Sequence, residues 1–296
     1  MRLKHIKTGG IAVFIAFSLH SCSKSSYSGT PAVTPPTMSV LLKADSKFGN
    51  ILTNPDGASL YFFGVDANGA SGCNGTCATI WLPFYTADTT NVGTGLNAAD
   101  FRTITRSDGS KQTTYKGWPL YTFSGDGTSG GGYGGTPVIH TVSGDGFAGI
   151  WFVAKPDYTV MIVKAQLLGD DGVMYDSTYI PKTEPTVYMT DDRGVTLYSF
   201  SFDSSANNNY TAADFSNNDF WPIVQISTVQ NVPSVLDKAD FSSITVDGKP
   251  QLTYKGWPVY QFGPDGMIRG NNKGISVPHP GIWPVMDQFS PEAPHL

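Results

Sequence analysis

The sequence predicts an all-β protein made of two tandem, sequence-related antiparallel β units of about 100 residues, with short helical turns and packed together. The composition is the first observation, because only 15% of the 296 residues are charged, 12% are aromatic and glycine is frequent. Such a composition is typical of exported β-rich proteins with many turns. The second observation is that the apolar segments are short and end at Asp-Gly, Asn-Pro-Asp-Gly and Lys-Gly turns. The third is an internal repeat.

The internal repeat is too long to arise by chance. Residues 96–123 align with residues 236–262 when Ser107 is left unpaired, and 17 of the 27 aligned pairs are identical. Within this stretch, the decapeptide TYKGWPLYTF returns as TYKGWPVYQF. Weaker matches join DGASLYFFGVD to DRGVTLYSFSFD, and GIW occurs twice. The six tryptophans follow the same pairing: Trp81 with Trp221, Trp118 with Trp257, and Trp151 with Trp283. We therefore predict two copies of one unit.

The repeat divides the chain into consecutive segments. We predict a signal peptide at 1–21, a lipidated cysteine with a disordered Ser/Pro/Thr linker at 22–44, a first repeat domain at 45–155, a connecting segment at 156–186, a second repeat domain at 187–287 and a C-terminal tail at 288–296. The connecting segment contains TVMIVKAQLL, an apolar stretch that predicts a strand. Because this segment is apolar, we expect two domains in firm contact, and one body paired through the aromatic faces is the alternative.

The N-terminus has the features of an export signal. Three basic residues precede an apolar run from Gly10 to Leu19, which is too short to span a bilayer. The run ends in Leu19-His20-Ser21-Cys22, which resembles the lipobox of bacterial lipoproteins, so Cys22 is expected to carry the lipid. An ordinary secretory signal is the alternative. Because a serine follows Cys22, sorting rules predict a cell envelope lipoprotein in the outer membrane of a Gram-negative bacterium.

A shorter motif, Tyr-x-Phe-x-x-Asp, occurs twice in each unit. Tyrosine and phenylalanine two residues apart lie on the same face of a strand, which predicts a buried aromatic face. The aspartate falls where the strand should end, so an Asx-type turn is its expected local role. Binding of a cation or a sugar by the Tyr/Asp pairs is the functional alternative. The four copies are Tyr61/Phe63/Asp66, Tyr121/Phe123/Asp126, Tyr198/Phe200/Asp203 and Tyr260/Phe262/Asp265.

Short turns connect these strands. In both decapeptides the Lys-Gly dipeptide predicts a turn that leads into the aromatic strand. Upstream of them, NAADF and DKADF each predict a single helical turn.

These motifs occur in an order that resembles a known family. The lipobox, the tandem Tyr-x-Phe-x-x-Asp motifs, CNGTCATIWLPF and TYKGWPLYTF together resemble predicted secreted-repeat lipoproteins, which share a conserved Yx(F/W/Y)xxD motif. The resemblance implies an envelope location and a repeated architecture, but no established activity. The chain departs from a perfect duplication at one place, because the second unit has NNNYTAADFSNNDFWPIV where the first has its cysteine loop.

Cysteine and histidine are scarce. After Cys22, only Cys73 and Cys77 remain, and in an oxidising compartment they most simply form a disulfide that closes a short loop. A redox-active pair is the alternative, although three residues separate the cysteines. His140 and His279 could converge on a metal, but two loop histidines are more commonly surface residues. We expect no bound cofactor and no metal.

Composition and motifs narrow the functional classes. The chain has 24 acidic and 19 basic residues, so no basic nucleic-acid surface is expected. Its expected partners are the membrane, through the N-terminal lipid, and a glycan or an envelope protein, which paired aromatic side chains suit. The leading hypothesis is a non-enzymatic binding protein. The alternatives are a redox or metal-handling accessory that uses Cys73 and Cys77, and a hydrolase that uses two of the repeated aspartates.

Overall fold

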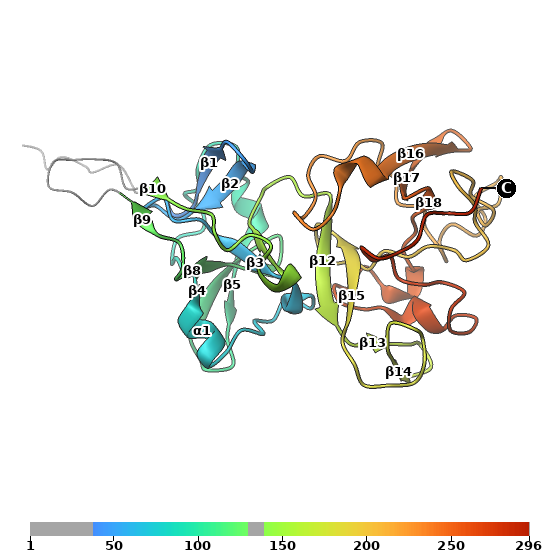
Figure 1. Ribbon diagram of the computed structural model, residues 1–296, viewed down its shortest axis with the longest axis horizontal. Coiled ribbons are helices and arrows are strands. Elements are labelled where there is room, and N and C mark those ends of the chain that lie inside the picture. Colours follow the sequence, from blue (N-terminus) through green and yellow to red (C-terminus); the bar gives the residue numbers. More distant parts are fainter. Residues whose placement is uncertain (1–37, 130–138, 296) are drawn as a thin grey trace, which may run out of the picture. The chain divides into compact units, whose positions relative to one another are not determined.

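The computed structural model describes residues 38–129 and 139–295 (Figure 1). Residues 37–296 form one compact unit. The predicted signal peptide, the lipidation at Cys22 and most of the linker lie outside the described residues. Among the residues that are described, no helix has the length and the apolar character needed to cross a membrane.

The predicted all-β class is confirmed, since the described chain contains a single α-helix of five residues. Every ladder between the strands of residues 38–129 and 139–295 is antiparallel. The elements of the first half are β1 (Leu41–Asp45), β2 (Gly49–Thr53), β3 (Tyr61–Phe63), η1 (Gly64–Asp66), α1 (Thr76–Ile80), β4 (Trp81–Pro83), η2 (Ala98–Asp100), β5 (Phe101–Thr105), β6 (Lys111–Tyr115), β7 (Trp118–Pro119), β8 (Tyr121–Phe123), β9 (Thr128–Ser129), β10 (Ile139–His140), η3 (Phe147–Gly149) and β11 (Trp151–Val153). Those of the second half are β12 (Val160–Ala165), β13 (Leu167–Leu168), β14 (Met174–Tyr175), β15 (Thr186–Asp191), η4 (Lys238–Asp240), β16 (Phe241–Val246), β17 (Lys249–Tyr254), β18 (Trp257–Pro258), η5 (Gly263–Asp265) and η6 (Lys273–Ser276).

A four-stranded sheet in the order β11-β3-β8-β4 forms the centre of the first unit. The two Tyr-x-Phe strands, β3 and β8, are neighbours, and Tyr61 lies opposite Tyr121 in their register. The flanking strands place Trp151 opposite Phe63 and Trp81 opposite Phe123. The sheet therefore gathers aromatic residues from four segments that are distant in sequence.

The second unit repeats this pairing, but through isolated β-bridges instead of continuous strands. Tyr198 forms antiparallel bridges with both Tyr260 and Val285, and Ile223 bridges to Tyr260. This is the same strand order as in the first unit. The flanking backbone bonds also repeat, because the Leu52 N–H donates to the Ala154 carbonyl and the Met189 N–H donates to the Met286 carbonyl, at 2.8 and 2.7 Å.

The predicted turns are present in both copies. Lys116 and Gly117 have φ angles of 49° and 83°, and Lys255 and Gly256 have 47° and 82°. Two successive residues with positive φ form the tight turn that suits the twist of a β-hairpin, and glycine tolerates the second position without strain. The single helical turns expected at NAADF and DKADF are η2 and η4.

The apolar connecting segment is a strand, as predicted. It forms β12, which pairs with β15 over six residues, with Ile162 opposite Met189. In the first unit, β1 pairs with β2 with Leu42 opposite Leu52. β12 therefore has the position in the second copy that β1 has in the first, and the loop between β12 and β15 carries the extra hairpin β13–β14.

The two copies are in direct contact through the first decapeptide. The Lys116 ammonium group lies 2.7 Å from an Asp192 carboxylate oxygen, and the Trp118 indole N–H donates to the Asp192 carbonyl. Arg269, from the second copy, donates to the carbonyls of Ala67 and Lys116 at 3.0 Å. Its guanidinium group also lies over the Trp118 ring. These contacts confirm the expected packing of the two units.

Candidate functional site

The two Tyr-x-Phe-x-x-Asp motifs of the first unit exchange hydrogen bonds. The Tyr61 hydroxyl donates to Asp126 Oδ2 at 2.7 Å, and the Tyr121 hydroxyl donates to Asp66 Oδ2 at 2.7 Å. Each tyrosine therefore binds the aspartate of the other motif, not its own. The adjacent positions of β3 and β8 make this exchange possible.

The second unit contains the same exchange. The Tyr198 hydroxyl donates to Asp265 Oδ2 at 2.6 Å, and the Tyr260 hydroxyl donates to Asp203 Oδ2 at 2.7 Å. The structure thus brings together all the motif tyrosines and aspartates as four cross-motif pairs. The sequence indicates this exchange in one respect only: each unit contains two copies of the motif, so each copy has a partner.

The second carboxylate oxygen of each aspartate fixes the loop that follows. Asp66 Oδ1 accepts the N–H of Gly72 and Asp203 Oδ1 accepts the N–H of Asn209, both at 2.7 Å. Asp265 and Asp126 accept the N–H groups of residues 273 and 143 in the same way. The expected Asx-type turn is therefore wrong in detail. The carboxylate closes a loop of six residues or more because its other oxygen is held by a tyrosine from the neighbouring strand.

Burial shifts the acidity of these pairs. Asp66 and Asp265 are fully buried, and Asp203 is 2% exposed. Burial raises the pKa of Asp66 to about 7 and that of Asp203 to about 6, even though hydrogen bonds from tyrosine and backbone act in the opposite direction. The pKa of Asp265 is also raised by burial. Because a substrate cannot reach these three buried carboxylates, the geometry favours a structural role for them.

The motif phenylalanines and four tryptophans form two columns of rings, in which successive rings are stacked except for Trp221 and Phe262, whose planes are tilted by 40°. In the first unit the order is Phe63, Trp151, Trp81 and Phe123, with successive centroid distances of 3.9, 3.8 and 4.2 Å. In the second unit the order is Phe200, Trp283, Trp221 and Phe262, with distances of 4.4, 3.7 and 4.5 Å. The two tryptophans of each column are therefore stacked on each other, although about 60–70 residues separate them in the sequence.

An aromatic pocket lies beside the second column. It has a volume of about 410 Å³ and is bordered by Trp221 and Trp283. Its walls include Phe202 and Phe220, which are 64% and 47% exposed. The sequence did not indicate this pocket. The aligned residues of the first unit are Val65 and Ile80, so the pocket walls are aromatic in the second copy only.

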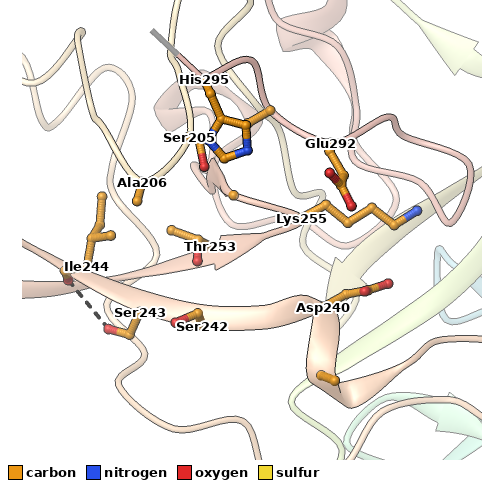
Figure 2. Close-up of a pocket in the computed structure, with 13 residues that line it drawn as sticks. Ser205, Ala206, Asp240, Ser242, Ser243, Ile244, Thr253, Lys255, Glu292 and His295 are labelled. Carbon is orange, nitrogen blue, oxygen red and sulfur yellow. Dashed lines mark hydrogen bonds between the residues drawn. The ribbon is translucent and has the colours of Figure 1, made fainter.

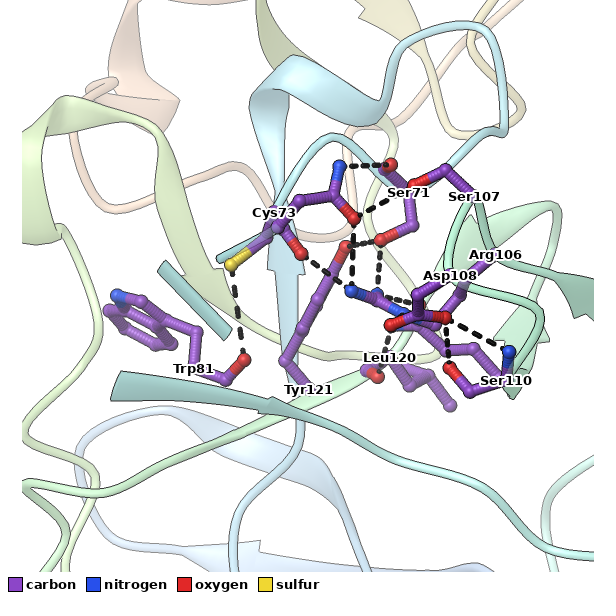
Figure 3. Close-up of polar contacts among 11 residues, drawn as sticks. Ser71, Cys73, Trp81, Arg106, Ser107, Asp108, Ser110, Leu120 and Tyr121 are labelled. Atoms are coloured by element: carbon purple, nitrogen blue, oxygen red, sulfur yellow. Dashed lines mark hydrogen bonds and ion pairs between the residues drawn. The ribbon is translucent and has the colours of Figure 1, made fainter. Parts of the chain in front are cut away.

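The first unit has a polar cluster around the cysteine loop (Figure 3). Cys73 and Cys77 form the predicted disulfide. Arg106 is 5% exposed, and its guanidinium group donates to the Cys73 carbonyl and to Gln112 Oε1 at 2.7 Å, and also to the Ser71 hydroxyl. A buried cation thus holds the cysteine loop against β6. The sequence does contain a sign of this role, because the residue aligned with Arg106 in the second unit is the apolar Val246.

The corresponding loop of the second unit is held by amide side chains. Gln251, which aligns with Gln112, donates to the Val259 carbonyl as Gln112 donates to the Leu120 carbonyl. Its oxygen accepts a hydrogen bond from Asn208 at 2.7 Å, where Gln112 accepts one from Arg106. The glutamine is therefore common to both copies, whereas its partner differs.

A second, polar pocket of about 410 Å³ lies where the C-terminal tail crosses β16 and β17 (Figure 2). Glu292 and His295 of the tail face Asp240 and Thr253 across it. The Lys255 ammonium group donates to the carbonyls of Gln288 and Ser290 instead of binding either carboxylate. The tail thus covers the second Lys-Gly turn as the Asp192 turn covers the first.

The two histidines of the metal hypothesis belong to different segments of the chain. His140 belongs to β10, whereas His279 borders the aromatic pocket. Over residues 38–129 and 139–295, no group of three or more histidine, cysteine or acidic side chains is arranged to hold a metal ion.

Comparison with known proteins gives one match. Residues 43–85 and 102–136 match the model of a family described as "Secreted repeat of unknown function". The two matched stretches contain the first and second Tyr-x-Phe-x-x-Asp motifs, and they confirm the resemblance to secreted-repeat proteins. The match indicates an extracellular or envelope location. No match was found among the curated proteins or among the solved structures.

Proposed function

We propose that the chain is a non-enzymatic binding protein of the cell envelope, and that its binding site is the aromatic pocket of the second unit. The observation that carries this proposal is the pair of exposed phenylalanines, Phe202 and Phe220, beside a pocket of about 410 Å³. Pockets for small ligands typically have volumes of roughly 300–1,000 Å³ and a mainly apolar lining.

The exposed rings pack edge-on against rings of the second column, but the column does not need them. Each Tyr-x-Phe-x-x-Asp frame is complete without them, because the first unit builds the same ring column with Val65 and Ile80 at the aligned positions. Large apolar side chains that gather at a solvent-exposed pocket commonly mark a binding site. We infer that the second copy kept the frame and acquired the site.

The buried frame also supports a binding role over hydrolysis. The described carboxylates of the motif each accept a tyrosine hydroxyl, and none of them borders the aromatic pocket. A hydrolase needs two accessible carboxyls with separated pKa values in one cleft.

The envelope location rests on the leader and on the repeat match. The lipobox at Leu19–Cys22 supports attachment through a lipid on Cys22, and the linker that follows would keep the folded units clear of the membrane surface. Cys22→Ala should abolish lipidation and release the protein from the membrane fraction. Persistence of palmitate labelling in this variant would contradict the anchor.

A ligand screen tests the binding role. A library of metabolites, glycans and divalent metals is added to the purified protein, and the melting temperature is measured. We expect at least one compound to raise it for the parent but not for the Phe202→Ala/Phe220→Ala double variant, because only the folded pocket binds the ligand. The matched control is Val65→Ala/Ile80→Ala in the first unit, which should keep the shift. A library in which no shift depends on the pocket would contradict the proposal.

A further inference from the structure

We propose that the ligand of the aromatic pocket is a planar, uncharged aromatic molecule and not a carbohydrate. This inference rests on the proposed function, because it names the chemical class that the same pocket takes. It is carried by the orientation of the rings, by the polarity of the lining and by a comparison with the first unit.

The ring column leaves no tryptophan face for a sugar. Trp221 stacks on Trp283 with one face, and the Phe262 ring, tilted by 40°, packs against its other side at 4.5 Å. Trp283 is stacked between Trp221 and Phe200. The two indoles are 1% and 2% exposed. Sugar recognition by tryptophan uses an open ring face, whereas both faces of both indoles are already covered. What remains for the pocket is their edges.

Ring edges favour an aromatic guest. The edge of an aromatic ring carries partial positive charge and its face carries partial negative charge, so a second ring binds an edge with its face in a T-shaped contact. The same column already contains such contacts, because Tyr198 meets Trp221 at 81° and Tyr260 meets Trp283 at 86°. A planar ligand between Phe202 and Phe220 would repeat this geometry.

The polarity of the lining excludes a ligand with many hydroxyl groups. Apart from the indole N–H groups of Trp221 and Trp283, Tyr210 and His279 carry the polar groups among the ten residues that border the pocket. The Tyr210 ring is itself packed edge-on against Trp283. A hydroxyl group that loses water without gaining a partner costs about 1–3 kcal/mol, so a disaccharide would bind weakly here. The lining includes no carboxylate, lysine or arginine, which favours a neutral ligand.

The first unit shows that a phenyl ring fits beside such a column. When the two GIW segments are aligned, Phe147 occupies the position of His279. The Phe147 ring contacts Trp81 edge to face, at 5.7 Å and 62°, and also lies 6.0 Å from Phe123. In the first copy, the Phe147 side chain thus packs against the ring column. In the second copy, the aligned residue is His279, which is exposed.

Calorimetric titration with two probes tests the ligand class. The purified protein is titrated with 2-naphthol, a planar aromatic alcohol, and with cellobiose. We expect 2-naphthol to bind with one site per chain and to change the tryptophan fluorescence. Phe202→Ala and Phe220→Ala should each weaken its binding at least tenfold. Phe289→Ala is the control, because this side chain is 76% exposed and does not border the pocket.

The outcomes separate the ligand class from the binding role. If cellobiose binds and its affinity depends on Phe202 and Phe220, the class is wrong while the pocket remains a binding site. If 2-naphthol fails to bind, or binds all variants equally, the aromatic class is overturned. The library screen described above then decides independently whether any pocket-dependent ligand exists.

Discussion

The two units of this protein share a frame and differ in the loops attached to it. Both contain the crossed Tyr–Asp hydrogen bonds, a column of four rings and a glutamine that fixes the strand after the hairpin. The loop after the first motif, however, is closed by a disulfide and a buried arginine in one unit and by asparagine side chains in the other. The frame therefore does not depend on one particular loop.

This difference separates structure from function within the repeat. Residues that maintain the frame are identical in the two copies, and most of them are buried. Residues that differ, such as Val65 and Phe202 or Ile80 and Phe220, are exposed at the same place in each unit. We infer that the Tyr-x-Phe-x-x-Asp motif builds a scaffold, on which each copy carries its own loop surface.

The largest effect is expected from the ring columns. Trp81→Ala and Trp221→Ala each remove a ring that is packed between two neighbouring rings, and each should lower the free energy of unfolding by roughly 3–5 kcal/mol. Urea denaturation of both variants measures this. Similar losses would support equivalent frames, whereas a large loss in one unit and a small loss in the other would show that only one column carries stability. Phe289→Ala, a highly exposed position, should change stability by less than about 0.5 kcal/mol.

A smaller effect is expected from the loop supports. Arg106→Leu leaves the Cys73 carbonyl and the Gln112 oxygen without their donor, which should cost about 1–3 kcal/mol. Val246→Leu at the aligned position of the second unit removes no hydrogen bond and should cost less than about 1.5 kcal/mol. Chemical denaturation compares the two variants, and amide exchange at residues 71–77 shows whether the loop has loosened. Equal costs with unchanged exchange would contradict a supporting role for Arg106.

The buried aspartates should make the stability of the protein depend on pH. Burial raises the pKa of Asp66 to about 7 and of Asp203 to about 6, from an ordinary value of 3.8. The folded protein then holds more protons than the unfolded chain above pH 4, so stability should fall as the pH rises through this window. The fall due to Asp203 ends near pH 6 and that due to Asp66 near pH 7.

Urea midpoints between pH 4 and pH 8 measure this slope. Asp203→Asn should flatten the curve up to about pH 6, and Asp66→Asn should flatten it up to about pH 7, because asparagine does not titrate. Exposed aspartates with lowered pKa values, such as Asp88 and Asp108, act below this window and do not interfere. A stability that rises from pH 4 to pH 7, or a slope unchanged in Asp66→Asn, would contradict the buried-carboxylate assignment.

The features that the sequence predicts are local or repeated. The Lys-Gly turns, the single helical turns and the disulfide depend on neighbouring residues, and the two-unit architecture is visible as identity between residues 96–123 and 236–262. The Tyr–Asp exchange was not predicted, because it depends on the register of strands about 60 residues apart. The aromatic pocket depends on loop geometry, which has no sequence period. A residue that breaks the repeat, as Arg106 does against Val246, is the signal that would have found the loop support.

The central claim is that each motif tyrosine is held by the aspartate of the other motif. Double-mutant cycles test it most directly, with Tyr→Phe and Asp→Asn substitutions and the free energy of unfolding as the readout. We predict a coupling of about 1 kcal/mol for the crossed pairs, Tyr121 with Asp66 and Tyr260 with Asp203. The pairs within one motif, Tyr121 with Asp126 and Tyr260 with Asp265, should be additive. Coupling within the motifs and additivity across them would contradict the claim.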